Sequence, residues 1–272
     1  MPSLHSLARS LDGRATRKLI AGAANRILAI RGDPRRFSTD DAGRWVNRQP
    51  GATFVSPDIF TGFRAQVAAR VKDRWCHAYT PSEGDVVVDL GAGFGDEALI
   101  FSDLVGRSGR VIAVEAHPRT FACLEETVRR SGAGNVSCVQ CAVSDRDGVL
   151  NISDSAAHVA NSVLLDGGSV PVPARSLDSL SNEVKIDRVD LLKINVEGAE
   201  REVVKGMDQI ASRIRHIVIE CHDFIADAGG SDRFRTRAEV TAALETFGFK
   251  VERRPYGGPH FLRDLIYASR EI

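Results

Sequence analysis

The residues that could do chemistry begin in the stretch VVVDLGAGFGD, residues 86–96, where an apolar run leads into closely spaced glycines. The glycines stand at alternate positions, and without Cβ atoms they let the backbone approach a bulky ligand. Dinucleotide-binding turns usually follow G-x-G-x-x-G, whereas this run is G-x-G-x-G with an aspartate two residues before the first glycine. The run therefore favours a different nucleoside-type cofactor over an ordinary glycine-rich turn. The predicted binding residues are Asp89, Gly91, Ala92, Gly93, Gly95 and Asp96.

Two further strand ends carry residues suited to the rest of such a cofactor. Glu115 ends the apolar run VIAVE, roughly 20 residues beyond the glycines, where a carboxylate can accept hydrogen bonds from both hydroxyls of a ribose. Ala116 and His117 follow it directly and could flank an adenine ring. Cys141 and Ala142, at the end of a third predicted strand, are small enough to leave room for that ring. The alternative interpretation of Glu115 is a solvated glutamate at a strand end.

A fourth stretch, DLLKINVEGAEREVVKGM at residues 190–207, predicts a strand that ends close to the glycine turn. This strand would deliver Asn195 to the cofactor and Glu197 to the acceptor. The next predicted strand, in IVIECHD, would bring Glu220 and His222 to a neighbouring strand end. Open α/β sheets bind their ligands at the carboxyl edge of the strands, so we expect these side chains to share one site.

Four ordered motifs, VVVDLGAGFGD, VIAVEAHP, CAVSD and LLKINVEGAEREVVKG, together resemble the FkbM family of S-adenosylmethionine-dependent O-methyltransferases over about residues 80–222. The resemblance implies a Rossmann-type fold, S-adenosylmethionine as the cofactor, and methylation of carbohydrate or natural-product hydroxyls. One departure is Asn195, because the family usually has Asp at this position. The exchange removes a negative charge near the sulfonium or the acceptor.

Methyl transfer to a sugar hydroxyl requires a route for the hydroxyl proton, because such a hydroxyl is a weak acid. His222 is the first candidate for a general base, since an imidazole titrates near neutral pH. It could instead cap a helix or bond to a backbone carbonyl. His158 is a second candidate, in a segment that could fold over the acceptor. Glu197 and Glu220 could together bind Mg²⁺, which accepts one or two carboxylates and would acidify a coordinated hydroxyl.

Predicted strands and helices, which must position these residues, alternate along the chain from residue 83 onward. This pattern predicts an α/β protein with a seven-stranded, mostly parallel sheet, helices on both faces and a Rossmann-like methyltransferase fold. Strands are expected at 85–90, 110–115, 136–142, 189–196, 216–221, 249–254 and 262–269, with an extended, hairpin-like region over 148–175. Helices are expected at 66–79, 95–105, 118–131, 199–211 and 236–247.

The chain is expected to divide into a segment over residues 1–64 and a methyltransferase domain over residues 65–272. Apolar residues recur at helical spacing over 1–30 and predict an N-terminal helical segment or lid. Residues 32–57 contain several prolines and glycines and are expected to be irregular. The helical part could cover the catalytic domain, pair two subunits in a homodimer, or touch a membrane surface.

Composition disfavours several classes of protein. The 272-residue chain has 36 basic and 36 acidic residues and a formal net charge of zero, so we expect no nucleic-acid partner. Five cysteines without paired spacing fit reduced thiols in a cytoplasmic protein. No segment approaches the roughly 20 apolar residues of a membrane span, so no stable membrane insertion is expected. The excess of arginine over lysine is typical of a GC-rich bacterial genome.

The sequence therefore predicts an S-adenosylmethionine-dependent O-methyltransferase, with or without Mg²⁺, that acts on a hydroxyl of a small molecule or oligosaccharide. The favoured acceptor is a sugar of a bacterial polysaccharide or glycolipid precursor, such as a methylated mannoside. A polyketide-type acceptor is the alternative within the family. An NAD-dependent oxidoreductase and a non-catalytic cofactor-binding protein are the alternatives of other classes, and the glycine spacing disfavours the oxidoreductase.

Overall fold

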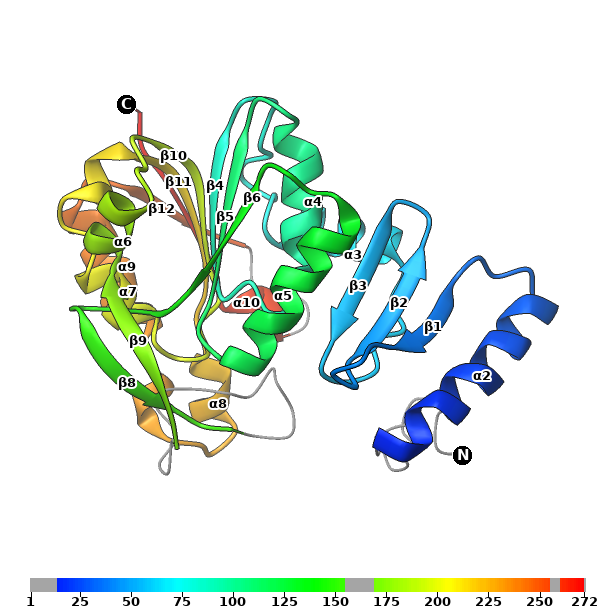
Figure 1. Cartoon of the computed structure of the whole chain (residues 1–272). Helices are drawn as coiled ribbons and strands as arrows, with labels where there is room; N and C mark the ends of the chain where they lie inside the picture. Colours follow the sequence, from blue (N-terminus) through cyan, green and yellow to red (C-terminus); the bar gives the residue numbers. More distant parts are fainter. Residues whose placement is uncertain (1–13, 155–168, 255–259, 272) are drawn as a thin grey trace.

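The computed structural model describes residues 14–154, 169–254 and 260–271, and its centre is a seven-stranded sheet (Figure 1). Neighbouring strands run parallel except at β13, which is antiparallel to both of its neighbours. In spatial order the strands are β12 (Lys250–Arg253), β13 (Leu265–Ser269), β11 (Ile214–Glu220), β10 (Val189–Ile194), β4 (Val86–Leu90), β5 (Arg110–Glu115) and β6 (Val136–Gln140). The predicted seven-stranded, mostly parallel sheet is confirmed.

Helices cover both faces of this sheet, because its central strands are apolar on both sides. Val87 packs toward one set of helices and Val88 toward the other, and Leu191 and Leu192 on β10 alternate in the same way. The first face carries α3 (Arg64–Arg74), α4 (Asp96–Val105) and α5 (Pro118–Ser131), and the second carries α6 (Leu177–Glu183), α7 (Glu200–Lys205) and α9 (Arg237–Thr246). This arrangement is the Rossmann-like methyltransferase fold.

The helix expected over 199–211 is two separate pieces, α7 and the 3₁₀ helix η2 (Ile210–Arg213). Between them the chain passes very close to a neighbouring strand, since a Cβ on Gly206 would lie 2.2 Å from the carbonyl oxygen of Ser144. The remaining short helices are α8 (Asp223–Asp227), η3 (Asp232–Phe234) and α10 (His260–Arg263). None of the helices in the described ranges combines the length and apolar character needed to cross a lipid bilayer.

A second, smaller sheet follows β6. The strand expected over 136–142 is interrupted at Cys141, and β7 (Ala142–Ser144) leaves the main sheet to pair in parallel with β9 (Val170–Ser176). β8 (Gly148–Ile152) pairs antiparallel with β9, as the hairpin-like prediction for this region anticipates. Residues 155–168, which lie between β8 and β9 in the sequence, are outside the described part of the chain.

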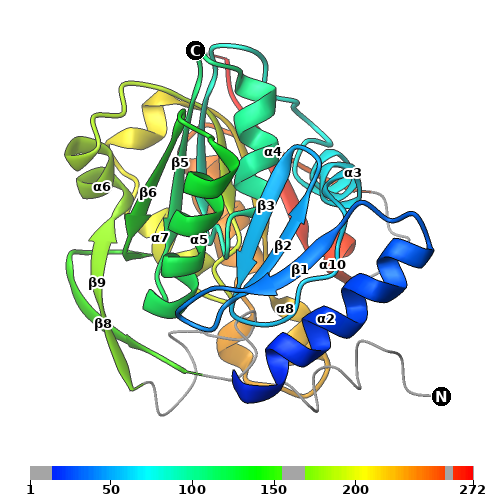
Figure 2. The same ribbon diagram turned by 45° about the vertical axis from the view of Figure 1, so that its right-hand side comes forward.

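The N-terminal part contains more regular structure than the sequence suggests. Helix α2 (Arg14–Ile30) forms as expected, but residues 32–57 form an antiparallel sheet of β1 (Arg36–Thr39), β2 (Trp45–Gln49) and β3 (Ala52–Ser56). The expectation of an irregular segment was wrong because two of its glycines are hairpin turns, with φ of 79° at Gly43 and 74° at Gly51. Figure 2 shows this sheet between the core and α2, which lies at the outer edge.

The N-terminal sheet is joined to the core by hydrogen bonds as well as apolar contacts. The backbone amide of Val55 on β3 donates to Thr127 Oγ1 on α5 at 2.9 Å, and the amide of Thr53 donates to Ser131 Oγ at 3.0 Å. The ring of Phe54 meets Phe60 edge-on, with 5.3 Å between ring centroids. This docking holds the loop after β3 at the carboxyl edge of the main sheet.

Candidate active site

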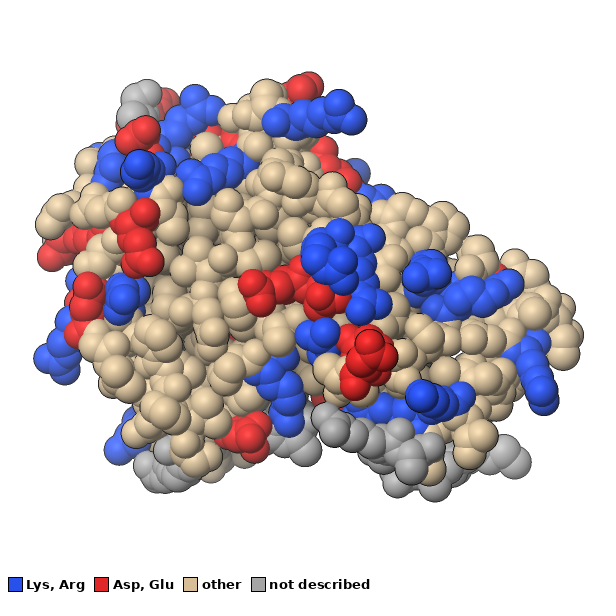
Figure 3. Space-filling model, viewed as in Figure 1, with Lys and Arg blue, Asp and Glu red and all other residues tan. Residues whose placement is uncertain are grey.

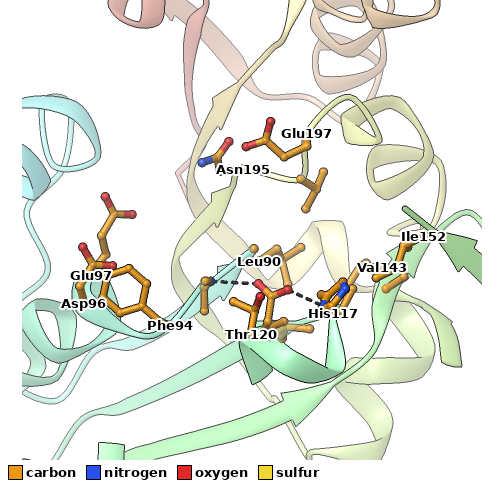
Figure 4. Close-up of a pocket in the computed structure, with 18 of the residues that line it drawn as sticks. Leu90, Phe94, Asp96, Glu97, His117, Thr120, Val143, Ile152, Asn195 and Glu197 are labelled. Atoms are coloured by element: carbon orange, nitrogen blue, oxygen red, sulfur yellow. Dashed lines mark hydrogen bonds between the residues drawn. The ribbon is translucent and has the colours of Figure 1, made fainter. Parts of the chain in front are cut away.

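A pocket of about 570 Å³ opens at the carboxyl ends of β4, β5 and β10 (Figure 4). Most of its wall comes from five stretches of chain that are distant in the sequence. They are residues 58–62 after β3, the glycine turn with the start of α4, residues 114–117, residues 141–143 and residues 195–199. Single side chains are added by Arg70, Arg74, Thr120 and Ile152. A concave site at this edge of an open α/β sheet is the usual position for a nucleoside-type ligand.

The glycine turn is held directly against the end of β10. Gly91 has φ of 76°, and a Cβ there would lie 1.9 Å from the carbonyl oxygen of Asn195, so only glycine fits. The amide of Asn195 donates to the carbonyl oxygen of Leu90 at 3.0 Å, which fixes the two strand ends together. Gly91, Ala92 and Gly93 line the pocket, whereas Gly95 caps the N-terminus of α4 behind it.

Asp89 lies behind the turn and does not form part of the pocket wall. It is fully buried, and its carboxylate is 2.8 Å from Nζ of Lys193 on β10. The same ammonium donates to the carbonyl oxygen of Gly91 at 2.9 Å and lies 3.7 Å from the carboxylate of Glu97. Because a buried charge must be paired, Lys193 ties β4, β10 and α4 together beneath the turn. Asp89 therefore supports the turn from below instead of facing a ligand.

Glu115 lines the pocket at the end of β5 and is fixed by backbone donors. Its Oε2 accepts a hydrogen bond from the amide of Gly93 at 3.0 Å, and its Oε1 accepts one from the amide of His117 at 2.9 Å (Figure 4). Charge-assisted hydrogen bonds of this kind orient a carboxylate strongly. The ribose-binding position predicted for Glu115 thus coincides with a preorganised acidic group in the wall.

One end of the pocket is enclosed by neutral groups. Ala116, His117, Cys141 and Ala142 all lie in its wall, where the sequence places an adenine ring. Burial lowers the pKa of His117 below its ordinary 6.5, which favours an uncharged imidazole. Burial also raises the pKa of the Cys141 thiol to about 12, so the sulfur stays protonated. Val143 completes this end (Figure 4).

The other end of the pocket is strongly charged. Asp96, at the start of α4, is 2.6 Å from Arg70 on α3, and the same guanidinium is 3.0 Å from Glu97. All three residues line the pocket, and Figure 4 shows the two acids beside Phe94. Asp96 is among the binding residues predicted from the sequence, whereas Arg70 and Glu97 are not. The position of Arg70 on a helix that precedes the first motif gives no sequence signal for a site.

Asn195 and Glu197 face the pocket from the end of β10, side by side in Figure 4. The Oδ1 atom of Asn195 is buried and has no hydrogen-bond partner among the described residues. Glu197 adopts φ of 52°, a left-handed conformation that is unusual for a residue with a side chain. Such a backbone is retained at functional sites where it aims a side chain, and here it directs a carboxylate into the cavity.

His222 lies behind Glu197 and does not line the pocket. Its Nδ1 is 2.8 Å from Oε1 of Glu200, and its Nε2 is 3.3 Å from Oε2 of Glu197. Although burial alone would lower it, the carboxylates of Glu200 and Glu197 raise the pKa of His222 well above 6.5. An imidazolium cannot accept a proton, so this geometry argues against the general-base role that the sequence suggests for His222. Thr236 completes the network by donating to Oε2 of Glu200 at 2.9 Å.

Glu220 is committed to a different partner. Its carboxylate is buried at the end of β11 and lies 2.5 Å from the guanidinium of Arg74, and Glu220 is not part of the pocket wall. Glu197 is engaged with His222 instead. Within the described residues, no cluster of three or more His, Cys, Asp or Glu side chains could hold a metal ion. The predicted Mg²⁺ site at Glu197 and Glu220 does not fit this arrangement, and neither does a direct catalytic role for Glu220.

One predicted residue cannot be placed in the site, and one loop of the site was not predicted. His158, the second predicted base, lies outside the described residues. The loop 58–62 lines the pocket and brings Phe60 to within 5.0 Å of Phe94, measured between ring centroids. Because this loop follows the N-terminal sheet, which the sequence does not predict, its position in the site could not be predicted from the spacing of residues in the sequence.

The fold and the pocket together define this protein as a Rossmann-like methyltransferase. The chain belongs to the FkbM methyltransferase family, because the Methyltransferase FkbM domain matches residues 89–251, more than half of its length. The resemblance predicted from the four motifs is thereby confirmed.

Relatives of this chain act on different acceptors, to judge from their names. It is 30% identical over 173 residues to the hexuronic acid methyltransferase AglP of Haloferax volcanii, covering 63% of this chain and 68% of AglP. It is 31% identical over 231 residues to the 31-O-demethyl-FK506 methyltransferase FkbM of Streptomyces tacrolimicus, covering 72% of this chain and 81% of that protein.

A solved structure supports the fold. The crystal structure of methyltransferase FkbM from Methylobacillus flagellatus KT matches with a TM-score of 0.50 and 14% identity. The match covers 71% of this chain and 45% of that chain.

Proposed function

We propose that this protein is an S-adenosylmethionine-dependent O-methyltransferase whose acceptor is a hydroxyl of a sugar or a related small molecule. The observation that carries the proposal is that Glu115 and Glu197 lie in the wall of one pocket. Glu115 is fixed by two backbone amides, and Glu197 stands beside Asn195 at another strand end. Such a pocket provides one carboxylate for ribose hydroxyls and a second for the hydroxyl that is methylated.

The residues of the pocket fit S-adenosylmethionine, which when bound supplies an activated methyl group on a positively charged sulfonium. The glycine turn leaves space, since apart from its chain neighbours no atom of the described residues lies within 4 Å of the position that a Cβ on Gly93 would take. Asp96 and Glu97 provide negative charge suited to an ammonium, and Arg70 provides a donor for a carboxylate. The Oδ1 of Asn195, which has no hydrogen-bond partner in the described part of the chain, offers an acceptor within the same cavity.

Glu197 is the residue that we assign to the acceptor proton. Its carboxylate lies in the pocket wall, and Nε2 of His222 behind it is 3.3 Å from Oε2, which holds the carboxylate in place. The acceptor hydroxyl would donate to this carboxylate and pass its proton to it as the oxygen is methylated. His222 is then a positioning residue, held in turn by Glu200.

The proposed acceptor class is supported by two aromatic residues in the pocket wall and by the names of the relatives. Phe60 and Phe94 place aromatic rings in the wall, and aromatic faces suit the apolar side of a sugar ring. One relative is named for a hexuronic acid and the other for a demethylated FK506. A sugar hydroxyl is therefore our first proposal, and a hydroxyl of a polyketide-type natural product is the alternative.

Replacement of Glu197 by Gln tests the assignment. The assay measures release of S-adenosylhomocysteine with a panel of hexoses, hexuronic acids and hydroxylated macrocycles. Because a positioned general base contributes roughly 10²- to 10⁴-fold, we expect Glu197→Gln to reduce kcat by about 100-fold or more while cofactor affinity stays nearly unchanged. The control Glu183→Gln, on the exposed surface of α6, should behave like the unaltered protein. Full activity of Glu197→Gln would contradict the assignment.

A further inference from the structure

Helix α2 has apolar side chains on two faces, and among the described residues only one of these faces is covered. Ala21 on the inner face is buried together with Phe37 and Trp45 of the N-terminal sheet. The outer face carries Leu19, which is 75% exposed, and Ile30, which is 86% exposed. Ile27, on the same outer side, is 40% exposed. These are three of the four large hydrophobic side chains that stand exposed among the described residues; the fourth is Val149 on β8.

Basic side chains surround the exposed apolar stripe of Leu19, Ile27 and Ile30. Helix α2, with the sequence RATRKLIAGAANRILAI, contains four basic residues and no acidic residue. Lys18 and Arg26 are exposed on one side of the stripe, and Arg31 follows the last turn and is also exposed. Arg17 points inward, where its guanidinium lies over the ring of Trp45 at 5.7 Å from the centroid. In Figure 3 the outer edge of the molecule, where α2 lies, shows Lys and Arg among uncharged residues.

Charge decides which occupant fits this surface. A second copy of the chain would bring two helices of like charge together, and repulsion between their basic side chains would oppose that contact. An anionic lipid surface offers the complementary arrangement. Its acyl boundary takes up aliphatic side chains, while its headgroups attract the Lys and Arg side chains that flank them. The inner face of α2 stays packed on β1, so the helix would lie flat between the protein and the lipid.

We propose that α2 is a peripheral anchor that binds anionic membrane surfaces through Leu19, Ile27 and Ile30, with Lys18 and Arg26 at the headgroups. The contact is interfacial and needs no membrane-spanning segment. It rests on the surface of the N-terminal part and is independent of the reaction proposed above.

Flotation of the full chain with lipid vesicles tests this anchor. We expect the protein to bind vesicles of phosphatidylcholine that contain phosphatidylglycerol, more weakly as salt is raised, and to bind pure phosphatidylcholine vesicles poorly. The double variant Leu19→Glu, Ile30→Glu should lose about tenfold or more of this binding. Val149→Glu, which removes the fourth exposed hydrophobic side chain away from α2, is the matched control and should bind normally.

A second pair of variants separates the electrostatic from the apolar part. The double variant Lys18→Glu, Arg26→Glu should weaken binding to vesicles that contain phosphatidylglycerol by about tenfold or more. The reason is that each basic side chain near an anionic surface adds to the free energy of binding. Thermal unfolding checks that these surface variants remain folded. The proposal would be overturned by folded protein that binds neither kind of vesicle. It would also be overturned if the unaltered protein sediments as a dimer and binds no vesicles, while the double variant Leu19→Glu, Ile30→Glu sediments as a monomer.

Discussion

At the scale of single residues, the most informative group is the imidazolium of His222 between two carboxylates. The sequence predicts a base here because histidine ordinarily titrates near neutral pH, but the structure places Glu200 and Glu197 on its two ring nitrogens. Sequence spacing could not reveal Glu200, which comes from the same motif as Glu197 yet turns into the interior. The predicted base is therefore better described as the support of a carboxylate.

This arrangement predicts a pH-dependent contribution of His222 to stability. Because its folded-state pKa lies well above the ordinary 6.5, the stabilisation is fully present below about pH 6.5 and declines as the pH rises through the folded-state pKa. At pH 6 we expect His222→Gln to lower the free energy of unfolding by about 3–5 kcal/mol, the usual effect of breaking a buried ion pair. The difference from the unaltered protein should shrink at alkaline pH. Urea unfolding of both proteins across this range measures it, and a difference that stays constant or grows with pH would contradict the charged imidazole.

Lys193 shows what the sequence can and cannot tell at this scale. A lysine within the apolar run DLLKI could be noticed, but its partners Asp89 and Glu97 lie about a hundred residues earlier in the chain. Their pairing appears only when β10 is placed beside β4. The structure thus moves Asp89 from the set of predicted ligand-binding residues to the support beneath them.

At the scale of elements, the glycine turn and the end of β10 form one unit. We expect Gly91→Ala to destabilise the protein by about 3 kcal/mol or more, because a left-handed backbone is combined with a clash against the carbonyl oxygen of Asn195. Gly93→Ala is the matched control. It has a similar φ of 56° but open space around the new Cβ, so about 1–2 kcal/mol is expected. Urea unfolding compares them, and equal losses would show that the close contact with Asn195 is unimportant.

The central elements could be predicted from the sequence, and the N-terminal sheet could not. β4 and β5 are mostly apolar runs bounded by glycine and polar residues, which is the pattern of strands buried on both faces. β1 to β3 are short and interrupted by Gly43 and Gly51, so the local sequence resembles a loop. Their strand structure depends on packing against α5 and α2, which is tertiary information.

At the scale of the whole molecule, the balanced charge of the sequence is visible on the surface. Figure 3 shows acidic and basic side chains interspersed over the core, consistent with a formal net charge of zero. The pocket instead gathers acidic groups from several elements, with Asp96, Glu97, Glu115 and Glu197 in its lining beside Arg70 and Arg74. A local excess of acidic side chains of this kind suits a ligand that carries positive charge.

The position of the pocket follows from the sheet order, whereas the identity of the ligand does not. In the strand order 12-13-11-10-4-5-6, the chain adds β5 and β6 on one side of β4 and then crosses to add β10 and β11 on the other side. Ligands bind at such a switch point in open α/β sheets. The four motifs could be assigned to this edge from the sequence because each ends a strand. The contribution of residues 58–62 became evident only from the way the N-terminal sheet docks on α5.

Isothermal titration of the purified protein with S-adenosylhomocysteine tests the central claim most directly. We expect binding to the unaltered protein and no detectable binding of NAD under the same conditions. Glu115→Ala should weaken the affinity by about tenfold or more, because hydrogen bonds to a charged group contribute roughly 1.5–3 kcal/mol. Glu125→Ala, at an exposed position on α5, should bind normally. Absence of S-adenosylhomocysteine binding, or equal affinity in Glu115→Ala, would contradict the account of the pocket.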